Sequence, residues 1–291
     1  MWAVNYAVAR IAPGIVSPHV LALGRWSLAG LILVIIARDE LWRERKSTLK
    51  AWPQYLILGL LGMLICGAWV YWAGETTTAI NIALIYAASP VLITLGAVIG
   101  LKEPFSFKQG LGVVIALLGV LHVVVKGQWV ALSQVVWVMG DGLIVIAMVS
   151  WAGYALLQKK WSSPLSSTAR LAATCIGGSA VLLPFALYEW FGTVHVEWSH
   201  NASALVVLAA IFPGVGAYWA YSFCQKTLGA SRVAASLYLG PLYGSVVGWF
   251  LLNESLGWHH AVGAALILPG IYLASSRPMA DCKSAIKRAS V

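Results

Sequence analysis

Apolar runs of about 20 residues, separated by short polar stretches, make up almost the whole chain. An α-helix needs a run of this length to cross a hydrocarbon core of about 30 Å. A transmembrane β-barrel would show alternation over about ten residues, and stretches such as LGLLGMLICGAWV do not alternate. The pattern predicts an all-α polytopic membrane protein with ten helices, at about residues 1–12, 17–37, 53–73, 79–101, 107–125, 136–157, 168–190, 203–224, 233–252 and 259–275.

Composition supports this interpretation and excludes several others. Hydrophobic residues make up 60% of the chain and charged residues only 10%, whereas a soluble domain carries about 25% charged residues. The net charge is +9, but the basic residues form no stripe with aromatics, so we expect no nucleic-acid partner. The four Cys have no metal spacing and suggest no disulfide framework. Because H-E-x-x-H and G-x-S-x-G are also absent, we expect no metal, no cofactor and no enzyme activity.

The positions of the positive charges predict an orientation in the membrane. Of the 19 Lys and Arg, 15 lie at alternate ends of the predicted helices, and only Arg10 and Lys126 lie at the opposite ends. Short cytoplasmic loops are enriched in Lys and Arg. We therefore expect a multi-pass membrane protein with both termini in the cytoplasm. The segments that carry the 15 charges are residues 38–50, 102–108, 159–160, 226–232 and 277–288.

The chain resembles itself after a shift of about 150 positions. Each half contains five predicted helices, an odd number, so the second half must enter the membrane from the opposite face. The sequence thus predicts two inverted repeats, residues 1–125 and 136–275, followed by a basic tail at 276–291. Inverted repeats recur in transporters, where the substrate site lies near the midplane. The residues that pair are Pro90 with Pro241, Glu103 with Glu254, Gly112 with Gly263, Gly119 with Gly270 and Trp2 with Trp151.

The first predicted helix is shorter than its counterpart in the second half. It has only about 12 residues, which rise about 18 Å and are too few to span the membrane. Trp151 follows about 14 apolar residues of the sixth helix, whereas its partner Trp2 follows only Met1. We expect about half a helix to be absent at this end.

Pro90 and Pro241 lie thirteen residues before Glu103 and Glu254, near the middle of the fourth and ninth helices. A Pro at this depth removes a backbone hydrogen bond and tends to kink the helix. Pro is also commoner in membrane helices in general, but two at matching repeat positions favour a functional kink.

Two long segments carry a resemblance to a known family. NIALIYAASPVLITLGAVIGLKEPFSFKQGLGVVIALLGV and GASRVAASLYLGPLYGSVVGWFLLNESLGWHHAVGAALILPGIYL resemble the two repeats of EamA-type members of the drug/metabolite transporter superfamily. The resemblance implies ten helices, two inverted repeats and a central cavity lined mostly by the third, fourth, eighth and ninth helices. It also implies export of amino acids or other metabolites across the bacterial inner membrane.

Several polar side chains at membrane depth are candidates for substrate binding. Arg25 lies near the middle of the second helix, where a charge is costly and usually faces a cavity or a partner; it could equally bond carbonyls of a neighbouring helix. Asn81, Tyr86 and Tyr238 precede the two prolines, and their amide and phenol groups could bind a carboxylate or an amine. Bonding between helices is the alternative for these three. Asp141 opens the sixth helix, where a carboxylate favours the helix dipole.

The remaining candidates are aromatic or repeat-related. Trp69 and Trp219 lie on helices that should line the cavity and would supply apolar walls. Trp2, Asn5, Trp151 and Tyr154 could close the cavity at one end. The full set of expected substrate-binding residues is Asn81, Tyr86, Pro90, Tyr238, Pro241, Trp69, Trp219, Arg25, Trp2, Asn5, Trp151 and Tyr154.

These observations predict an exporter of amino acids or related small metabolites that works by alternating access. Only Arg25 is clearly deep, so a sugar phosphate, which would want several Lys or Arg, is a poorer fit. The expected partners are a small-molecule solute and the lipid bilayer, and no oligomeric state is indicated. An importer of a similar solute and a non-transport membrane sensor or scaffold are the alternatives.

Overall fold

The computed structural model describes residues 4–5, 8, 11–77, 79–134, 136–192, 198–252 and 256–276. This part of the chain consists of helices joined by short loops and contains no β-strand. The α-helices are α2 (Pro18–Arg43), α3 (Arg45–Lys50), α4 (Trp52–Gly59), α5 (Trp69–Ala73), α6 (Ala79–Tyr86), α7 (Ser89–Leu101), α8 (Phe107–Val124), α9 (Met139–Lys160), α10 (Ser167–Gly192), α11 (His200–Ala209), α12 (Tyr218–Leu228), α13 (Ala230–Ala235), α14 (Gly240–Leu252) and α15 (Trp258–Ala274). Two π-helical segments, η1 (Leu60–Ala68) and η3 (Ala210–Ala217), and two 3₁₀ segments, η2 (Trp129–Gln134) and η4 (Ser236–Leu239), complete the set.

The described helices are those of a polytopic membrane protein, as predicted. Seven of them, within the residues described, are long and apolar enough to cross a membrane: Pro18–Arg43, Trp52–Ala73, Asn81–Leu101, Phe107–Val124, Met139–Lys160, Ser167–Gly192 and His200–Leu228. Trp258–Ala274 is a shorter apolar helix. The helix expected over residues 1–12 lies largely outside the described part, and the count of ten stays a prediction.

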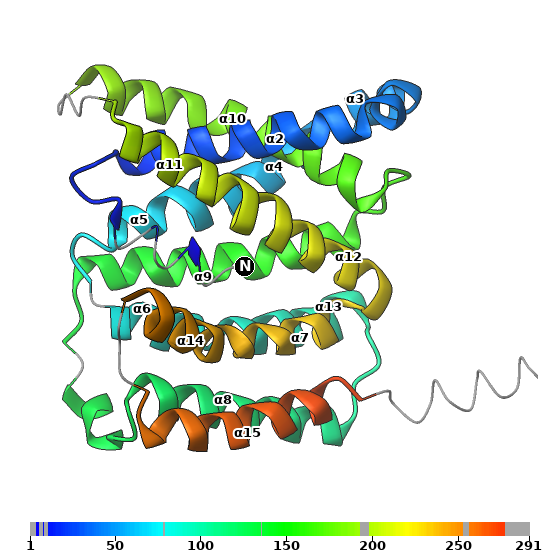
Figure 1. The fold of residues 1–291 in the computed structure, drawn as a ribbon. Helices are drawn as coiled ribbons and strands as arrows, with labels where there is room; N and C mark the ends of the chain where they lie inside the picture. The colour runs from blue at the N-terminus through cyan, green and yellow to red at the C-terminus, as the bar shows by residue number, and fades with distance from the viewer. Residues whose placement is uncertain are drawn as a thin grey trace, which may run out of the picture.

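The helices run roughly alongside one another in a layered bundle (Figure 1). α2 and α10 pack together at one edge, α8 and α15 at the other, and α9 runs through the middle between them. α3, the α9–α10 loop, the α7–α8 loop and the α12–α13 turn all lie at the same end of the bundle, on the right in Figure 1. These are the segments in which the sequence gathers its Lys and Arg.

Both expected kinks coincide with breaks in the structure. α6 ends at Tyr86 and α7 begins at Ser89, with Pro90 in its first turn. In the second half, the 3₁₀ segment η4 separates α13 from α14, and Pro241 is the second residue of α14. Because Pro has no backbone N–H, it cannot continue the α-helical hydrogen-bond ladder into the preceding segment. At the second break the Gly240 N–H instead donates to the carbonyl of Leu237.

The elements recur along the chain at the spacing found in the sequence. α2 and α10 each have 26 residues and begin 149 positions apart. α7 and α14 each have 13 residues and begin 151 positions apart. The π segments η1 and η3 begin 150 positions apart.

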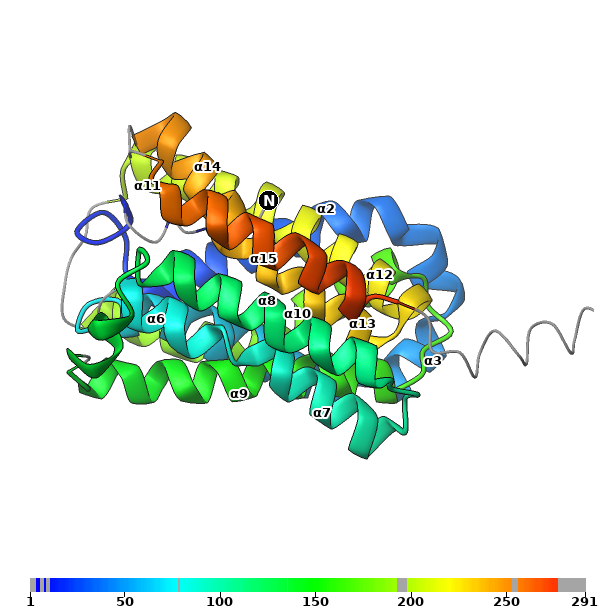
Figure 2. The ribbon, with the colours of Figure 1, turned by 90° about the horizontal axis from the view of Figure 1, so that it is seen from below.

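Glycines let α8 and α15 approach each other closely, and the two helices lie side by side in Figure 2. A Cβ on Gly112 would lie 2.5 Å from the carbonyl oxygen of Gly270, and one on Gly119 would lie 3.0 Å from that of Gly263. Such glycines allow close contact between membrane helices. The contacts are reciprocal, since Gly112 pairs with Gly263 and Gly119 with Gly270 in the sequence repeat.

Candidate functional site

Arg25 is a buried cation in the first third of α2, with only 3% of its surface exposed. Its Nη1 donates a hydrogen bond to the Asn5 side-chain oxygen, over 3.0 Å, and another to the Tyr71 hydroxyl, over 3.2 Å. The Tyr71 hydroxyl in turn donates to the same Asn5 oxygen, over 2.6 Å. The guanidinium is thus held by two neutral side chains, and its Nε has no hydrogen-bond partner in the described part of the chain.

Aromatic rings surround the guanidinium. Its carbon lies 4.4 Å from the Trp26 ring centre and 6.0 Å from that of Tyr218, both within cation–π range. Tyr218 contacts Trp26 edge-on at 4.7 Å and Trp151 at 5.5 Å, and Trp151 stacks on Tyr154 at 5.3 Å. We call Trp26, Trp151, Tyr154, Tyr218 and Tyr221 the aromatic cluster; Tyr221 contacts Trp151 at 5.2 Å.

The π segment η1 runs beside this cluster. π-helical turns are rare and often mark functional sites. The Tyr218 hydroxyl donates to the carbonyl of Gly62 over 2.8 Å, and the Ser150 hydroxyl donates to the carbonyl of Leu61 over 2.9 Å. A Cβ on Gly62 would lie 2.7 Å from the Tyr154 ring, so only Gly fits there. The carbonyls of η1 therefore accept hydrogen bonds from side chains of α9 and α12.

The second π segment, η3, reaches the same place from the other half of the chain. A Cβ on Gly214 would lie 3.8 Å from Arg25 Nε and 3.3 Å from the Ala29 side chain. η3 also contains Pro213, which lacks an N–H and disturbs the helical hydrogen-bond ladder. Both π segments thus border the arginine and its aromatic cluster.

Tyr86 also approaches η1. The Tyr86 hydroxyl lies 3.4 Å from the sulfur of Cys66, which belongs to η1. This expected substrate-binding residue sits at the end of α6, immediately before the break at Pro90, and it faces the π segment.

Asn81 is instead tied to another helix. Its amide nitrogen donates to both carboxylate oxygens of Asp141, over 3.1 and 3.0 Å. The Thr77 hydroxyl also donates to Asp141, and the Val138 N–H donates to it over 2.9 Å. Asp141 thus accepts a hydrogen bond from the backbone at the start of α9. Its position at a helix N-terminus favours such a role for a carboxylate. The contact of Asn81 is a bond between helices, the alternative that the sequence left open.

Tyr238 and Pro241 lie apart from the arginine, toward α8 and α15. Tyr238 is buried in η4, in a core cluster that includes Val113, Ala116 and Ile267. Its hydroxyl has no hydrogen-bond partner among the described residues. The carbonyl of Pro241 accepts a hydrogen bond from the Ser245 hydroxyl over 2.8 Å.

The tryptophan candidates lie in different environments, one packed against the core and one partly exposed. Trp69 begins α5 and packs against the main core. Trp219 is 39% exposed, its indole N–H donates to the Thr168 hydroxyl over 2.9 Å, and it stacks on Phe223. These contacts differ from those of its neighbour Tyr218, which joins the aromatic cluster. Trp2 lies outside the described residues.

The sequence predicted Arg25, Asn5, Trp151 and Tyr154 as substrate-binding residues. In the structure all four lie in one region, around Arg25 and the aromatic cluster. Sequence reasoning missed Tyr71, Tyr218 and Ser150, whose partners are an amide oxygen and two backbone carbonyls. The available signal was Gly and Pro within apolar helices, at Gly62 and at Pro213–Gly214, since both residues mark irregular helix turns.

A polytopic helical bundle with a buried cation beside irregular helix turns is typical of an integral membrane transporter. Comparison with known proteins specifies the family. The model of the EamA-like transporter family matches residues 1–125 and 138–276. The chain belongs to the EamA-like transporter family, as its sequence motifs predicted.

Similar proteins come from archaea and bacteria. An uncharacterized transporter of Archaeoglobus fulgidus is 26% identical, over 95% of this chain and 94% of its own. The uncharacterized transporter YvbV of Bacillus subtilis is 28% identical, over 98% and 92%. A probable terminal-alkyne amino-acid exporter of Streptantibioticus cattleyicolor is 25% identical, over 96% and 91%. A solved crystal structure shares the fold, with a TM-score of 0.76, 17% identity, and coverage of 94% of this chain and 92% of that one.

Proposed function

We propose that this transporter exports amino acids or related small metabolites across the inner membrane, with Arg25 binding the carboxylate of the solute. The observation that carries the proposal is the buried guanidinium whose described hydrogen-bond partners, Asn5 and Tyr71, are both neutral. A buried charge without a counterion is costly. A solute carboxylate would supply the opposite charge and could be held by two parallel hydrogen bonds.

The surroundings of Arg25 suit an amino acid. The faces of Trp26 and Tyr218 lie within cation–π distance of one cation already and could accept an ammonium group in the same way. The apolar rings would contact the solute's side chain. The similarity to a protein named a probable terminal-alkyne amino-acid exporter points to the same class of solute.

The recurrence of elements supports two inverted repeats, residues 1–125 and 136–275, within a ten-helix protein. A pseudo-two-fold relation produces reciprocal contacts, in which i meets j′ and j meets i′. The contacts of Gly112 with Gly270 and of Gly119 with Gly263 follow this rule. Transporters built in this way work by rocking one half against the other around a central site, and their basic loops face the cytoplasm.

The other expected residues have a place in this mechanism. The breaks at Pro90 and Pro241 lie in corresponding helices of the two repeats. Because Pro has no N–H, both helices are interrupted at matching places, and these breaks could let the helices bend when the halves separate. We propose Tyr86 and Tyr238 as neighbouring hydroxyl donors. The walls and ends of the solute path would be formed by Asn81, Trp69, Trp219, Trp2, Asn5, Trp151 and Tyr154.

The test is transport of labelled solutes by the purified protein in liposomes. We expect Arg25→Gln to lower transport of a carboxylate solute about tenfold or more, since hydrogen bonds to a charged group are worth about 1.5–3 kcal/mol. Arg25→Lys keeps the charge but loses the planar guanidinium, so its transport rate should lie between those of the wild type and Arg25→Gln. Arg38→Gln is the matched control, because the Arg38 side chain is exposed near the end of α2. Monodispersity and apparent melting temperature separate a transport defect from misfolding.

A second arm compares each amino acid with its decarboxylated amine. The wild-type protein should prefer the amino acid, and a folded Arg25→Gln variant should lose that preference. Equal transport of acid and amine by the wild-type protein would contradict the assigned role of Arg25. Efflux and uptake measured in cells distinguish export from import, and a protein that moves no solute from a broad panel would be a sensor or scaffold instead.

A further inference from the structure

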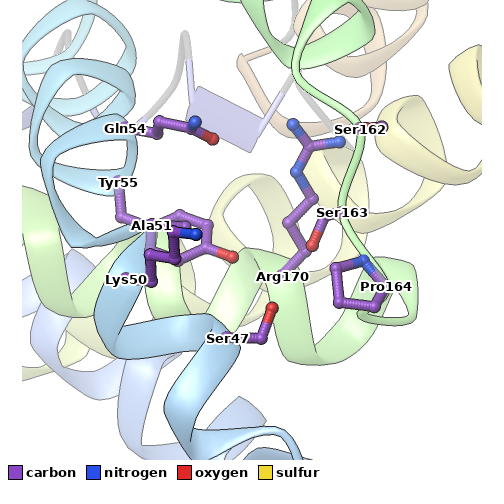
Figure 3. A pocket seen from close by; sticks show the side chains of 9 residues that line it. All are labelled: Ser47, Lys50, Ala51, Gln54, Tyr55, Ser162, Ser163, Pro164 and Arg170. Atoms are coloured by element: carbon purple, nitrogen blue, oxygen red, sulfur yellow. The ribbon is translucent and has the colours of Figure 1, made fainter.

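A pocket of ≈ 220 Å³ opens at the end of the bundle where the basic loops gather. It lies between the α3–α4 turn and the loop that joins α9 to α10 (Figure 3). Residues of the candidate solute site do not line it. Its lining is Ser47, Lys50, Ala51, Gln54, Tyr55, Ser162, Ser163, Pro164 and Arg170.

The pocket combines two positive charges with neutral polar groups. Lys50 and Arg170 come from different helices, and neither Asp nor Glu is among the lining residues. Side chains of Ser47, Ser163 and Gln54 can each donate a hydrogen bond. Two cations together with several donors form a site suited to an anion with several oxygens.

The guanidinium of Arg170 is held by one hydrogen bond and has a further donor without a partner among the described residues. Its Nη2 donates to the carbonyl of Trp161 over 2.7 Å. Its Nε is buried and has no hydrogen-bond partner in the part of the chain that the structure describes. Figure 3 shows the Arg170 side chain extending between the Ser162–Pro164 loop and the α3–α4 segment. Arg170 is also among the residues that line the pocket, and its guanidinium is well matched to phosphate.

Two exposed apolar residues are neighbours of the pocket residues along the chain. Leu49 and Trp52 are both exposed and flank Lys50 and Ala51 in the chain. Trp is enriched where a membrane helix meets the lipid headgroups. Basic pockets between membrane helices on the cytoplasmic side are also places where headgroups bind.

We propose that this pocket binds the phosphate group of an anionic ligand, with Lys50 and Arg170 as its positive contacts. Two sources share that chemistry: the headgroup of an anionic phospholipid and free inorganic phosphate. In the first case the acyl chains would run along Leu49 and Trp52. The pocket is separate from the Arg25 site, so the proposal does not depend on the proposed transport function.

The test uses the purified full-length protein in detergent. Binding of phosphatidylglycerol is measured by native mass spectrometry, with phosphatidylcholine as the lipid of neutral net charge. We expect phosphatidylglycerol to bind more tightly, and Lys50→Gln to weaken it about fivefold. Arg170→Gln should weaken it about tenfold. Lys46→Gln removes the same charge from an exposed position of the same helix outside the pocket, and it should change binding less than twofold.

A second arm uses inorganic phosphate and lipid-depleted protein. If free phosphate is the ligand, it raises the apparent melting temperature of the wild-type protein but not of Lys50→Gln, and phosphatidylglycerol shows no preference. If Arg170→Gln fails to fold, Ser163→Ala and Lys50→Gln carry the test. The proposal is overturned if Lys46→Gln and Lys50→Gln weaken binding equally, or if neither probe depends on Lys50.

Discussion

Glu103 joins the two halves of the chain through one carboxylate. The backbone N–H groups of Ala230 and Ser231 donate to its two oxygens, over 2.8 and 3.0 Å, and the Ser231 hydroxyl donates over 2.6 Å. Burial raises the pKa of Glu103, but these hydrogen bonds outweigh it and hold the pKa below its ordinary value. The ionised carboxylate therefore stabilises the folded protein, acting as a cap at the start of α13.

We expect Glu103→Gln to lower the free energy of unfolding by about 0.5–2 kcal/mol at neutral pH, because the amide replaces a charged acceptor with a neutral one. A carboxyl whose pKa is depressed in the folded state stabilises above its unfolded pKa of about 4.3 and loses that effect as pH falls through the folded value. The difference between wild type and variant should thus shrink in acid. Melting temperatures across a pH series measure this.

Glu75→Gln is the matched control for that substitution, because Glu75 is exposed in the turn after α5. It should leave the melting temperature at neutral pH unchanged. Equal effects of the two substitutions, or a Glu103→Gln effect that grows in acid, would show that the Glu103 cap is not the source of the stability.

At the scale of elements, the α8–α15 pair depends on glycines that no side chain can replace. A Cβ on Gly112 would lie 2.4 Å from the Ala274 backbone nitrogen, and backbone atoms cannot move aside as a flexible side chain would. We expect Gly112→Ala to destabilise the protein by about 1–3 kcal/mol through overpacking. The measurement is the apparent melting temperature in detergent, with the yield of monodisperse protein alongside.

Gly100→Ala tests the same change where space is open. Nothing lies within 4 Å of a Cβ on Gly100, and Ala favours a helix over Gly by about 1 kcal/mol. This variant should be as stable as the wild type or slightly more so. If Gly112→Ala behaved like Gly100→Ala, the close approach of α8 and α15 would not hold in the membrane protein.

The elements themselves were predictable to different degrees. The breaks beside Pro90 and Pro241 followed from the sequence, because the missing amide of Pro acts through covalent structure alone. The π segments η1 and η3 did not, because Gly and Pro mark an irregular turn without specifying its geometry. In η1 the carbonyl of Gly62 accepts from the Tyr218 hydroxyl, a group 156 positions away in the chain.

At the scale of the whole molecule, we predict that the basic end of the bundle faces the cytoplasm. Single Cys at Lys46 and at Val136 in a Cys-free variant test this, since Lys46 is exposed in α3 and Val136 is 76% exposed just before α9. A membrane-impermeant thiol reagent applied to intact spheroplasts should label Val136→Cys and spare Lys46→Cys. After lysis both should react. Labelling of Lys46→Cys alone in intact spheroplasts would reverse the orientation and contradict the charge argument.

The sequence by itself determined that this chain crosses a membrane repeatedly, where its mid-membrane prolines interrupt helices and which family it belongs to. Those properties depend on local hydropathy, covalent geometry and motif order. The tertiary structure decided which groups meet. Asn81 faces Asp141 and Arg25 faces Asn5 and Tyr71, because partners far apart in the chain depend on how each helix is rotated, packed and broken. A membrane helix is apolar on all of its faces, so its sequence pattern does not specify which face meets which neighbour.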